Sequence, residues 1–254
     1  MELEVAARTD VGCQRTNNED SFGYWNSAEE TSGDACVAVI ADGMGGHQAG
    51  EQASRIAVDT IIQAFRDAVI AGTVPELQPQ ALLMSALDKA HHAIRDQAER
   101  NPEFNGMGTT CTAAAIIGGW LYFVHVGDAR LYLIRSDEIQ RLTRDHSYTG
   151  RLVESGLLSA EDAERHPRRH ILTAALGIGD EVQADSSEKP IQLRNSEVLV
   201  FCTDGLWGLV SDAEIQAAVI GNSADSACQE LVALARERGG PDNITIQILR
   251  AVSE

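Results

Sequence analysis

The fold of this chain is decided by the stretch VAVIADGMGGHQAG, Val37–Gly50. It begins as a run of small apolar residues typical of a buried strand, reaches the carboxylate of Asp42, and then contains four glycines in eight residues. A buried carboxylate is costly unless it is paired or bound to a metal ion, and glycine lets the backbone approach another group closely. A single Asp-Gly pair is most often a solvated turn, so the interpretation depends on the rest of the sequence.

The composition predicts a soluble globular protein. The chain has 254 residues, of which 44% are hydrophobic, and this is enough for a substantial core in one large domain or two small ones. No apolar run is long enough to span a bilayer. The amino-terminal MELEVAARTD lacks the basic and apolar regions of a secretory signal. We therefore expect a cytoplasmic protein that does not contact a membrane.

Charge and cysteine content exclude several classes of function. The formal net charge is −18, from 20 basic and 38 acidic residues, which argues against nucleic acid or an anionic membrane as a partner. The five cysteines are widely spaced and form no Cys-x-x-Cys pair, so neither a zinc site nor a disulfide framework is indicated. None of them has an arginine six positions later, as a phosphate-binding loop with a cysteine nucleophile would require.

The pattern of apolar residues predicts strands and helices that are grouped rather than strictly alternating along the chain. The expected strands are residues 3–10, 36–42, 110–118, 120–128, 130–135, 197–204 and 243–249. The expected helices are about 48–71, 80–100, 212–220 and 225–238. Ser211 and Glu214 form a capping box at the start of the third of these helices. This grouping favours a layered α+β fold over a parallel βαβ fold.

Acidic residues stand at the rims of several of these apolar elements. They are Glu19, Asp20, Asp42, Asp128, Asp204 and Asp242. In strands of one sheet, such acids can converge at one edge, where carboxylates raise one another's pKa. A hard divalent cation removes that cost, and ligation by oxygen atoms alone fits magnesium or manganese. The sequence therefore predicts a magnesium or manganese site built from strand-end carboxylates.

Seven short motifs extend from about Asp10 to Leu249: RTNNED, ADGMGGH, GTT, VGDAR, DHS, TDGLW and GGPDNIT. In this order they resemble the metal-dependent protein phosphatases of the 2C type, and the methionine in DGMGGH resembles the bacterial branch. The resemblance implies a four-layer α-β-β-α sandwich of two antiparallel sheets flanked by helices. It implies a single phosphatase domain over residues 1–254. Within it, the polar segment at about 145–176 is expected to form a surface flap.

The same resemblance implies an activity. Members of this family hydrolyse phosphoserine and phosphothreonine in phosphorylated proteins, using a water activated by two Mn²⁺ or Mg²⁺ ions. Bacterial members bind a third ion more weakly. The implied partners are phosphoproteins made by an opposing serine/threonine kinase, and the expected oligomeric state is a monomer.

Seven residues match metal-site positions of the family. Asp42 matches the carboxylate that bridges the two ions, and Gly43 matches a ligand that offers its carbonyl oxygen. The other matches are the direct ligands Asp204 and Asp242, the acids Glu19 and Asp20 that hold metal-bound waters, and Asp128, a ligand of the third ion.

Two residues match catalytic positions. Arg15 matches the arginine that grips the phosphate, because a guanidinium fork suits two phosphate oxygens. Many eukaryotic members carry a proton-donating histidine where this chain has Met44, and the nearest histidine here is His47. As a general acid, His47 would matter most for an alkoxide leaving group. We therefore expect His47→Ala to slow phosphopeptide hydrolysis far more than hydrolysis of p-nitrophenyl phosphate. The alternative is a solvated histidine near a helix start.

Two other functions are alternatives to that of a phosphatase. A catalytically inactive regulatory module of the same family would usually have lost a metal-binding acid, and all of the matched acids are present. A metal-dependent nuclease or polyphosphate hydrolase is disfavoured by the acidic balance and the lack of a basic groove motif. Structural roles are expected for Thr109 and Thr110, and core packing is expected for Trp207.

Overall fold

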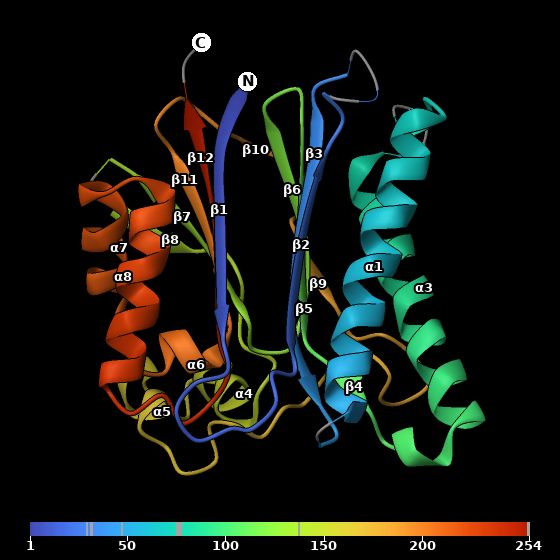
Figure 1. Ribbon diagram of the computed structural model, residues 1–254, viewed down its shortest axis with the longest axis vertical. Helices are drawn as coiled ribbons and strands as arrows, with labels where there is room; N and C mark the ends of the chain where they lie inside the picture. The colour runs from blue at the N-terminus through green and yellow to red at the C-terminus, as the bar shows by residue number, and fades with distance from the viewer. Residues whose placement is uncertain (29, 31–32, 47, 75–77, 137, 253–254) are drawn as a thin grey trace.

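The computed structural model describes residues 1–28, 30, 33–46, 48–74, 78–136 and 138–252. Its centre is formed by two antiparallel sheets that pack face to face, with helices on both outer sides (Figure 1). This is the expected four-layer α-β-β-α sandwich, an α+β fold. Among the described helices, none is long and apolar enough to cross a membrane.

The first sheet contains both ends of the described chain. Its strand order is β1, β12, β11, β7, β8. The bounds are β1 Glu2–Asp10, β12 Ile244–Val252, β11 Val198–Cys202, β7 Arg130–Arg135 and β8 Glu138–Arg141. Outside this sheet lie α7, Asp212–Gly221, and α8, Ala224–Glu237. The capping box of Ser211 and Glu214 at the start of α7 is confirmed.

The second sheet has the order β10, β6, β5, β3, β2, with β4 paired to β3 and β9 paired to β6. The bounds are β2 Asp20–Asn26, β3 Ala35–Met44, β4 Gly108–Thr109, β5 Cys111–Ile117, β6 Trp120–Val126, β9 Asp185–Ser186 and β10 Ile191–Gln192. Its outer face is covered by α1, Gln48–Ile70, and α3, Pro79–Arg100. A short 3₁₀ turn, Pro102–Phe104, follows α3.

Strand β3 is buried on both faces, which explains its unbroken apolar sequence. Val37 and Val39 pack against the cluster formed with α1 and α3, whereas Ala38 and Ile40 face the first sheet. A strand covered on both sides loses the apolar-polar alternation of a half-exposed strand. Each fully buried Leu, Ile or Phe side chain in these layers contributes about 1.5–3 kcal/mol. The core therefore holds the end of β3 rigidly in place.

Three of the strand ends expected at acids are wrong in detail. β6 ends at Val126 and not at Asp128. β3 does not end at Asp42 but continues to Met44, where it pairs with β4. Asp204 does not close β11, because it is the first residue of the short helix α6, Asp204–Trp207. Asp42 therefore lies inside β3 itself, whereas Asp204 belongs to the helix that follows β11.

The segment 145–176 contains two short helices, α4, Tyr148–Glu154, and α5, Ala160–Glu164. Ser147 and Ser159 cap them through hydrogen bonds from the backbone NH groups of Gly150 and Asp162. Both helices lie at the end of the sandwich that also carries α6 and β4, opposite the end marked by the two termini (Figure 1).

Candidate metal centre

A cavity of about 650 Å³ opens at the end of the sandwich where β3 and α6 meet. It is lined by most of the residues predicted to form the site. These are Arg15, Glu19, Asp42, Gly43, Asp128, Asp204 and Asp242. Asp20 is buried and pairs with Asp42 across β2 and β3. The histidine expected to donate a proton, His47, lies outside the described residues.

The backbone of Asp42 is held by two threonines. Its NH group donates to Thr110 Oγ1 at 2.9 Å, and its carbonyl oxygen accepts from Thr110 N and Thr109 Oγ1, both at 2.9 Å. This agrees with the structural role expected for the two threonines. Within the described part of the chain, no protein group donates a hydrogen bond to the Asp42 carboxylate. Burial, followed by repulsion from Asp20 and Asp204, holds the pKa of this carboxyl well above its usual range.

Close approach of two backbones explains the glycine at position 43. A Cβ atom there would lie 2.1 Å from the carbonyl oxygen of Gly50 and 2.6 Å from that of Glu19. The Gly43 NH group donates to the Glu19 carbonyl at 3.1 Å. Gly45 and Gly46 have φ values of 124° and 85°, which side chains rarely adopt. The glycines thus let the start of α1 fold back over the end of β3.

Asp20 is a buried acid with an unused oxygen. Thr203 Oγ1 and Thr245 Oγ1 donate to its Oδ2 at 2.9 Å and 2.6 Å, whereas its Oδ1 has no hydrogen-bond partner. Burial raises the pKa of Asp20 to about 7, against the lowering effect of the two threonines. A buried carboxylate oxygen without a partner fits an acid that accepts a hydrogen bond from a metal-bound water.

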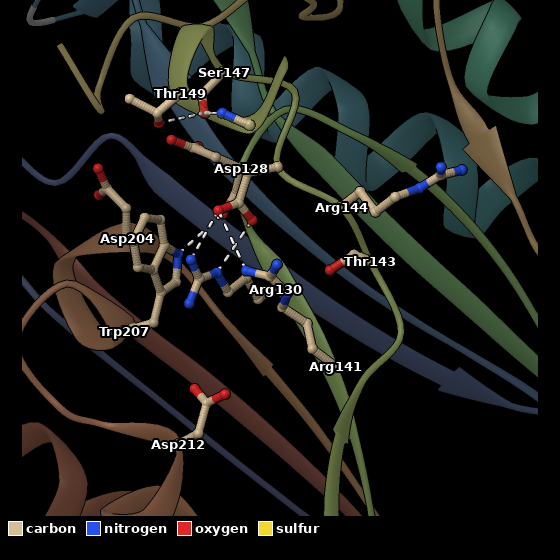
Figure 2. Close-up of polar contacts among 12 residues, drawn as sticks. Asp128, Arg130, Arg141, Thr143, Arg144, Ser147, Thr149, Asp204, Trp207 and Asp212 are labelled. Atoms are coloured by element: carbon tan, nitrogen blue, oxygen red, sulfur yellow. Dashed lines mark hydrogen bonds and ion pairs between the residues drawn. The ribbon is translucent and has the colours of Figure 1, made fainter. Parts of the chain in front are cut away.

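The other acids reach the cavity from separate elements. Asp204 begins α6 and its Oδ2 lies 3.2 Å from His170 Nδ1. Asp242 precedes β12 and accepts from Arg15 Nη2 at 2.7 Å. The carbonyl oxygen of Asp128 accepts from Trp207 Nε1 at 2.9 Å (Figure 2). Burial, with repulsion from Asp204, holds the pKa of Asp128 well above its usual range.

The comparisons with known proteins agree with this geometry. Residues 13–239 match the family described as protein phosphatase 2C. The chain belongs to the protein phosphatase 2C family. It is 37% identical over 252 residues to the protein phosphatase PhpP of Streptococcus pneumoniae, with 97% of each chain covered. It is 35% identical over 248 residues to the serine/threonine phosphatase stp of Listeria innocua, covering 97% of this chain and 95% of that one.

Solved structures of 2C phosphatases have the same fold. The Mycobacterium tuberculosis serine/threonine phosphatase PstP/Ppp has a TM-score of 0.86 and 35% identity, with 99% of each chain covered. A structure of the catalytic domain of PstP in complex with two manganese ions has a TM-score of 0.83 and 34% identity over 99% of each chain.

The donor set of this 2C family member fits hard divalent cations. Within the described ranges, no three carboxylate, histidine or cysteine side chains already converge on one metal position. Two of the acids instead contact Arg15 and His170. However, the acidic side chains that line the cavity offer oxygen atoms, and bound cations would offset the burial and the mutual repulsion that raise the pKa of Asp42 and Asp128.

Several residues of the 2C site were not predicted from the sequence. Asn243 Oδ1 accepts from the NH group of Glu19 at 2.8 Å, and its amide nitrogen donates to the carbonyl of Val11 at 3.0 Å. Arg169 and His170 reach the cavity from the segment 145–176. The signal that could have found these two residues was the concentration of arginine and histidine in this otherwise unassigned segment.

Proposed function

We propose that this protein is a metal-dependent serine/threonine protein phosphatase. The observation that carries the proposal is the single cavity into which Asp42, Asp128, Asp204 and Asp242 project in a chain of the 2C family. An inactive regulatory module is not favoured, because each acid that the family resemblance assigns to the site is present.

Each described residue of the site has its own proposed role. Asp42, the Gly43 carbonyl, Asp204 and Asp242 would hold two Mn²⁺ or Mg²⁺ ions, and Asp128 would hold a weaker third. Glu19 and Asp20 would act through bound water, for which Asp20 has its unused oxygen. When bound, two such ions supply Lewis acidity that activates a water and stabilises charge on the phosphoryl group.

Hydrolysis of phosphopeptides tests the proposal. A phosphothreonine peptide should be hydrolysed in the presence of Mn²⁺ or Mg²⁺, and the same peptide carrying phosphotyrosine should react much more slowly. Exhaustive chelation should abolish the activity, and added Mn²⁺ should restore it. Activity that survives chelation would contradict the proposed metal site, and an absence of hydrolysis with the metal present would support the inactive alternative.

Arg15 is proposed to orient the phosphate, although it contacts Asp242 in this structure. Arg15→Lys keeps the positive charge but loses the fork that binds two oxygens at once. We expect KM for a phosphopeptide to rise about tenfold, as for the loss of one charge-assisted hydrogen bond. Manganese affinity, measured by isothermal titration calorimetry, should be unchanged. Weaker manganese binding would instead mean that Arg15 organises Asp242.

The proposal extends to the domain organisation, the source of the substrates, the oligomeric state and the location of the protein. We propose one phosphatase domain over residues 1–254, with the segment 145–176 as its flap. The substrates are proposed to be products of a serine/threonine kinase, and the protein to be a cytoplasmic monomer that binds neither membrane nor nucleic acid. The net charge of −18 supports the expected lack of contact with nucleic acid and membrane, and the names of the Listeria and pneumococcal relatives support phosphoprotein substrates. The role of His47 as a proton donor stays a prediction.

A further inference from the structure

A second cavity, of about 430 Å³, lies beside the metal centre and is called here the flap cavity. Its walls come from α4 and α5 of the flap, from the segment between β8 and α4, and from α6 and the start of α7. Its polar lining contains three acids, two hydroxyl groups and four arginines, namely Arg130, Arg141, Arg144 and Arg169. Four arginines around one cavity are unexpected in a chain with a net charge of −18.

One of these arginines is fully engaged in the wall of the flap cavity. Arg130 donates to both carboxylate oxygens of Asp145, at 3.1 Å and 2.8 Å. Its guanidinium lies 3.6 Å from the ring centre of Trp207, and both residues are drawn in Figure 2. Asp212 accepts from Tyr132 Oη at 2.9 Å. These groups satisfy one another, so they define the shape of the cavity rather than its affinity for a ligand.

Arg144 belongs to the rim. It forms ion pairs with Glu154 at 3.4 Å and Asp185 at 3.3 Å, and its side chain is 67% exposed. In Figure 2 it extends away from Arg130 and Arg141. Its charge is therefore already balanced by the two neighbouring acids, and it offers little to a molecule inside the cavity.

Arg141 and Arg169 retain unused donors. Among the described residues, Arg141 forms one ion pair, and it is a long one, 3.5 Å to Asp145, whose carboxylate Arg130 already holds. In the described part of the chain, the Arg169 side chain makes no hydrogen bond or ion pair, and its Nε is buried without a partner. Thr149 Oγ1 has one hydrogen-bond partner among the residues that the structure describes, Ser147 Oγ at 3.2 Å (Figure 2). Two guanidinium groups from different elements and a hydroxyl thus face one cavity.

The flap cavity lies next to the metal centre, and this position indicates that its ligand belongs to the substrate. Arg169 lines both cavities, so it forms part of the wall between them. Trp207, which also lines the flap cavity, is hydrogen-bonded to Asp128 in the metal centre. A substrate whose phosphorylated residue lies over the metal centre would pass directly beside the opening of the flap cavity.

We propose that the flap cavity binds a second phosphoryl group on the same phosphoprotein substrate. This inference rests on the proposed phosphatase function. A phosphoryl group carries up to two negative charges and three acceptor oxygens, which suits guanidinium groups that approach from two walls. A carboxylate has fewer acceptors and a single charge. The flap cavity would therefore make the protein prefer segments that carry two phosphorylated residues.

Matched peptides test this preference. One series carries a single phosphothreonine, and a second series adds a phosphoserine at each position from two to eight residues away on either side. A third series has glutamate in place of that phosphoserine. With the manganese-loaded protein, we expect kcat/KM to be about tenfold higher for the doubly phosphorylated peptide at the best spacing, as for one added charge-assisted contact. Glutamate should give a clearly smaller gain.

Arg141→Gln should remove most of this advantage. Its kcat/KM for the singly phosphorylated peptide and for p-nitrophenyl phosphate should stay within twofold of the unsubstituted protein. Arg165→Gln is the matched control, because Arg165 is on the same flap but pairs with Glu161 in solvent and does not line the cavity. Arg165→Gln should leave the ratio of kcat/KM between the doubly and the singly phosphorylated peptides unchanged at every spacing.

Several results would overturn the inference. Equal kcat/KM for the two phosphopeptide series at every spacing would do so, as would an advantage that persists in Arg141→Gln. An equal gain in kcat/KM from glutamate would mean that the flap cavity binds any acidic side chain and not specifically a phosphoryl group.

If no phosphopeptide is hydrolysed, the proposed function fails and the flap cavity is tested by binding alone. Fluorescence anisotropy of the labelled peptides should then still show about tenfold tighter binding of the doubly phosphorylated form, which Arg141→Gln would abolish. Equal binding of both forms would reject the flap cavity as a phosphoryl site.

Discussion

Asp42→Asn is expected to lower the kcat of the manganese-loaded protein by roughly a thousandfold or more, because a shared metal ligand contributes several kcal/mol to the transition state. The substitution replaces a carboxylate that is proposed to bridge both ions with a neutral amide that cannot do so. The fold should survive, since the two threonines hold the backbone of Asp42 and not its side chain. Steady-state hydrolysis of a phosphothreonine peptide measures the loss, and circular dichroism checks the fold.

Asp128→Asn is the matched comparison within the same cavity. Asp128 is proposed to hold only the weaker third ion, so its loss should reduce kcat much less than the loss of Asp42. Calorimetric titration with Mn²⁺ should show high-affinity binding disrupted in Asp42→Asn and retained in Asp128→Asn. Similar losses of activity and of metal affinity in both variants would mean that the roles assigned to the two acids are wrong.

Arg130→Met is expected to destabilise the protein by about 3–5 kcal/mol, as when one partner of a buried ion pair is removed. Arg130 and Asp145 are 4% and 14% exposed. Burial alone would raise the pKa of Asp145, but Arg130 outweighs it and holds the pKa below its usual range. Methionine would leave this carboxylate with only the long contact to Arg141. Urea denaturation of the metal-free protein, followed by tryptophan fluorescence, measures the change in the free energy of unfolding.

A surface pair provides the control for this prediction. Arg8 and Asp225 lie 2.9 Å apart, but their side chains are 43% and 60% exposed. Water screens such pairs, so Arg8→Met should change the free energy of unfolding by less than about 1 kcal/mol. A loss in Arg130→Met no larger than that in Arg8→Met would show that Asp145 finds water or another partner when Arg130 is absent.

Local sequence was sufficient to predict most of the longer elements, but not the seven-residue strand β2, Asp20–Asn26. The apolar periodicity of residues 48–71 and 80–100 predicted α1 and α3 nearly to their observed bounds. The short strands β4, β9 and β10 were not predicted, because two-residue strands carry no periodicity and form only where a neighbouring strand offers its hydrogen-bonding groups. The packing of two sheets face to face came from the family resemblance and not from periodicity.

Only part of the candidate site could be predicted from the sequence. An acid beside glycine, as at Asp42 and Asp204, is a local signal. By contrast, the reason for Gly43 is its contact with Gly50 and Glu19, and that contact exists only after α1 folds back over β3. The unused donors of Arg141 and Arg169 could not be predicted, because whether a surface arginine has a partner depends on side chains far away in the sequence.

The pairing of β1 with β12 has a practical consequence for handling this enzyme. Glu2 lies opposite Val252, whereas Asp10 lies opposite Ile244, next to the metal centre. Eight residue steps of extended chain separate these two levels, roughly 27 Å. The beginning of β1 and the end of β12 lie at the end of the sandwich opposite α4, α5 and α6 (Figure 1). A fluorescent protein or a surface anchor fused to either terminus would therefore leave the active end open to phosphoproteins, and a short peptide joining the two termini would make a circular permutant feasible.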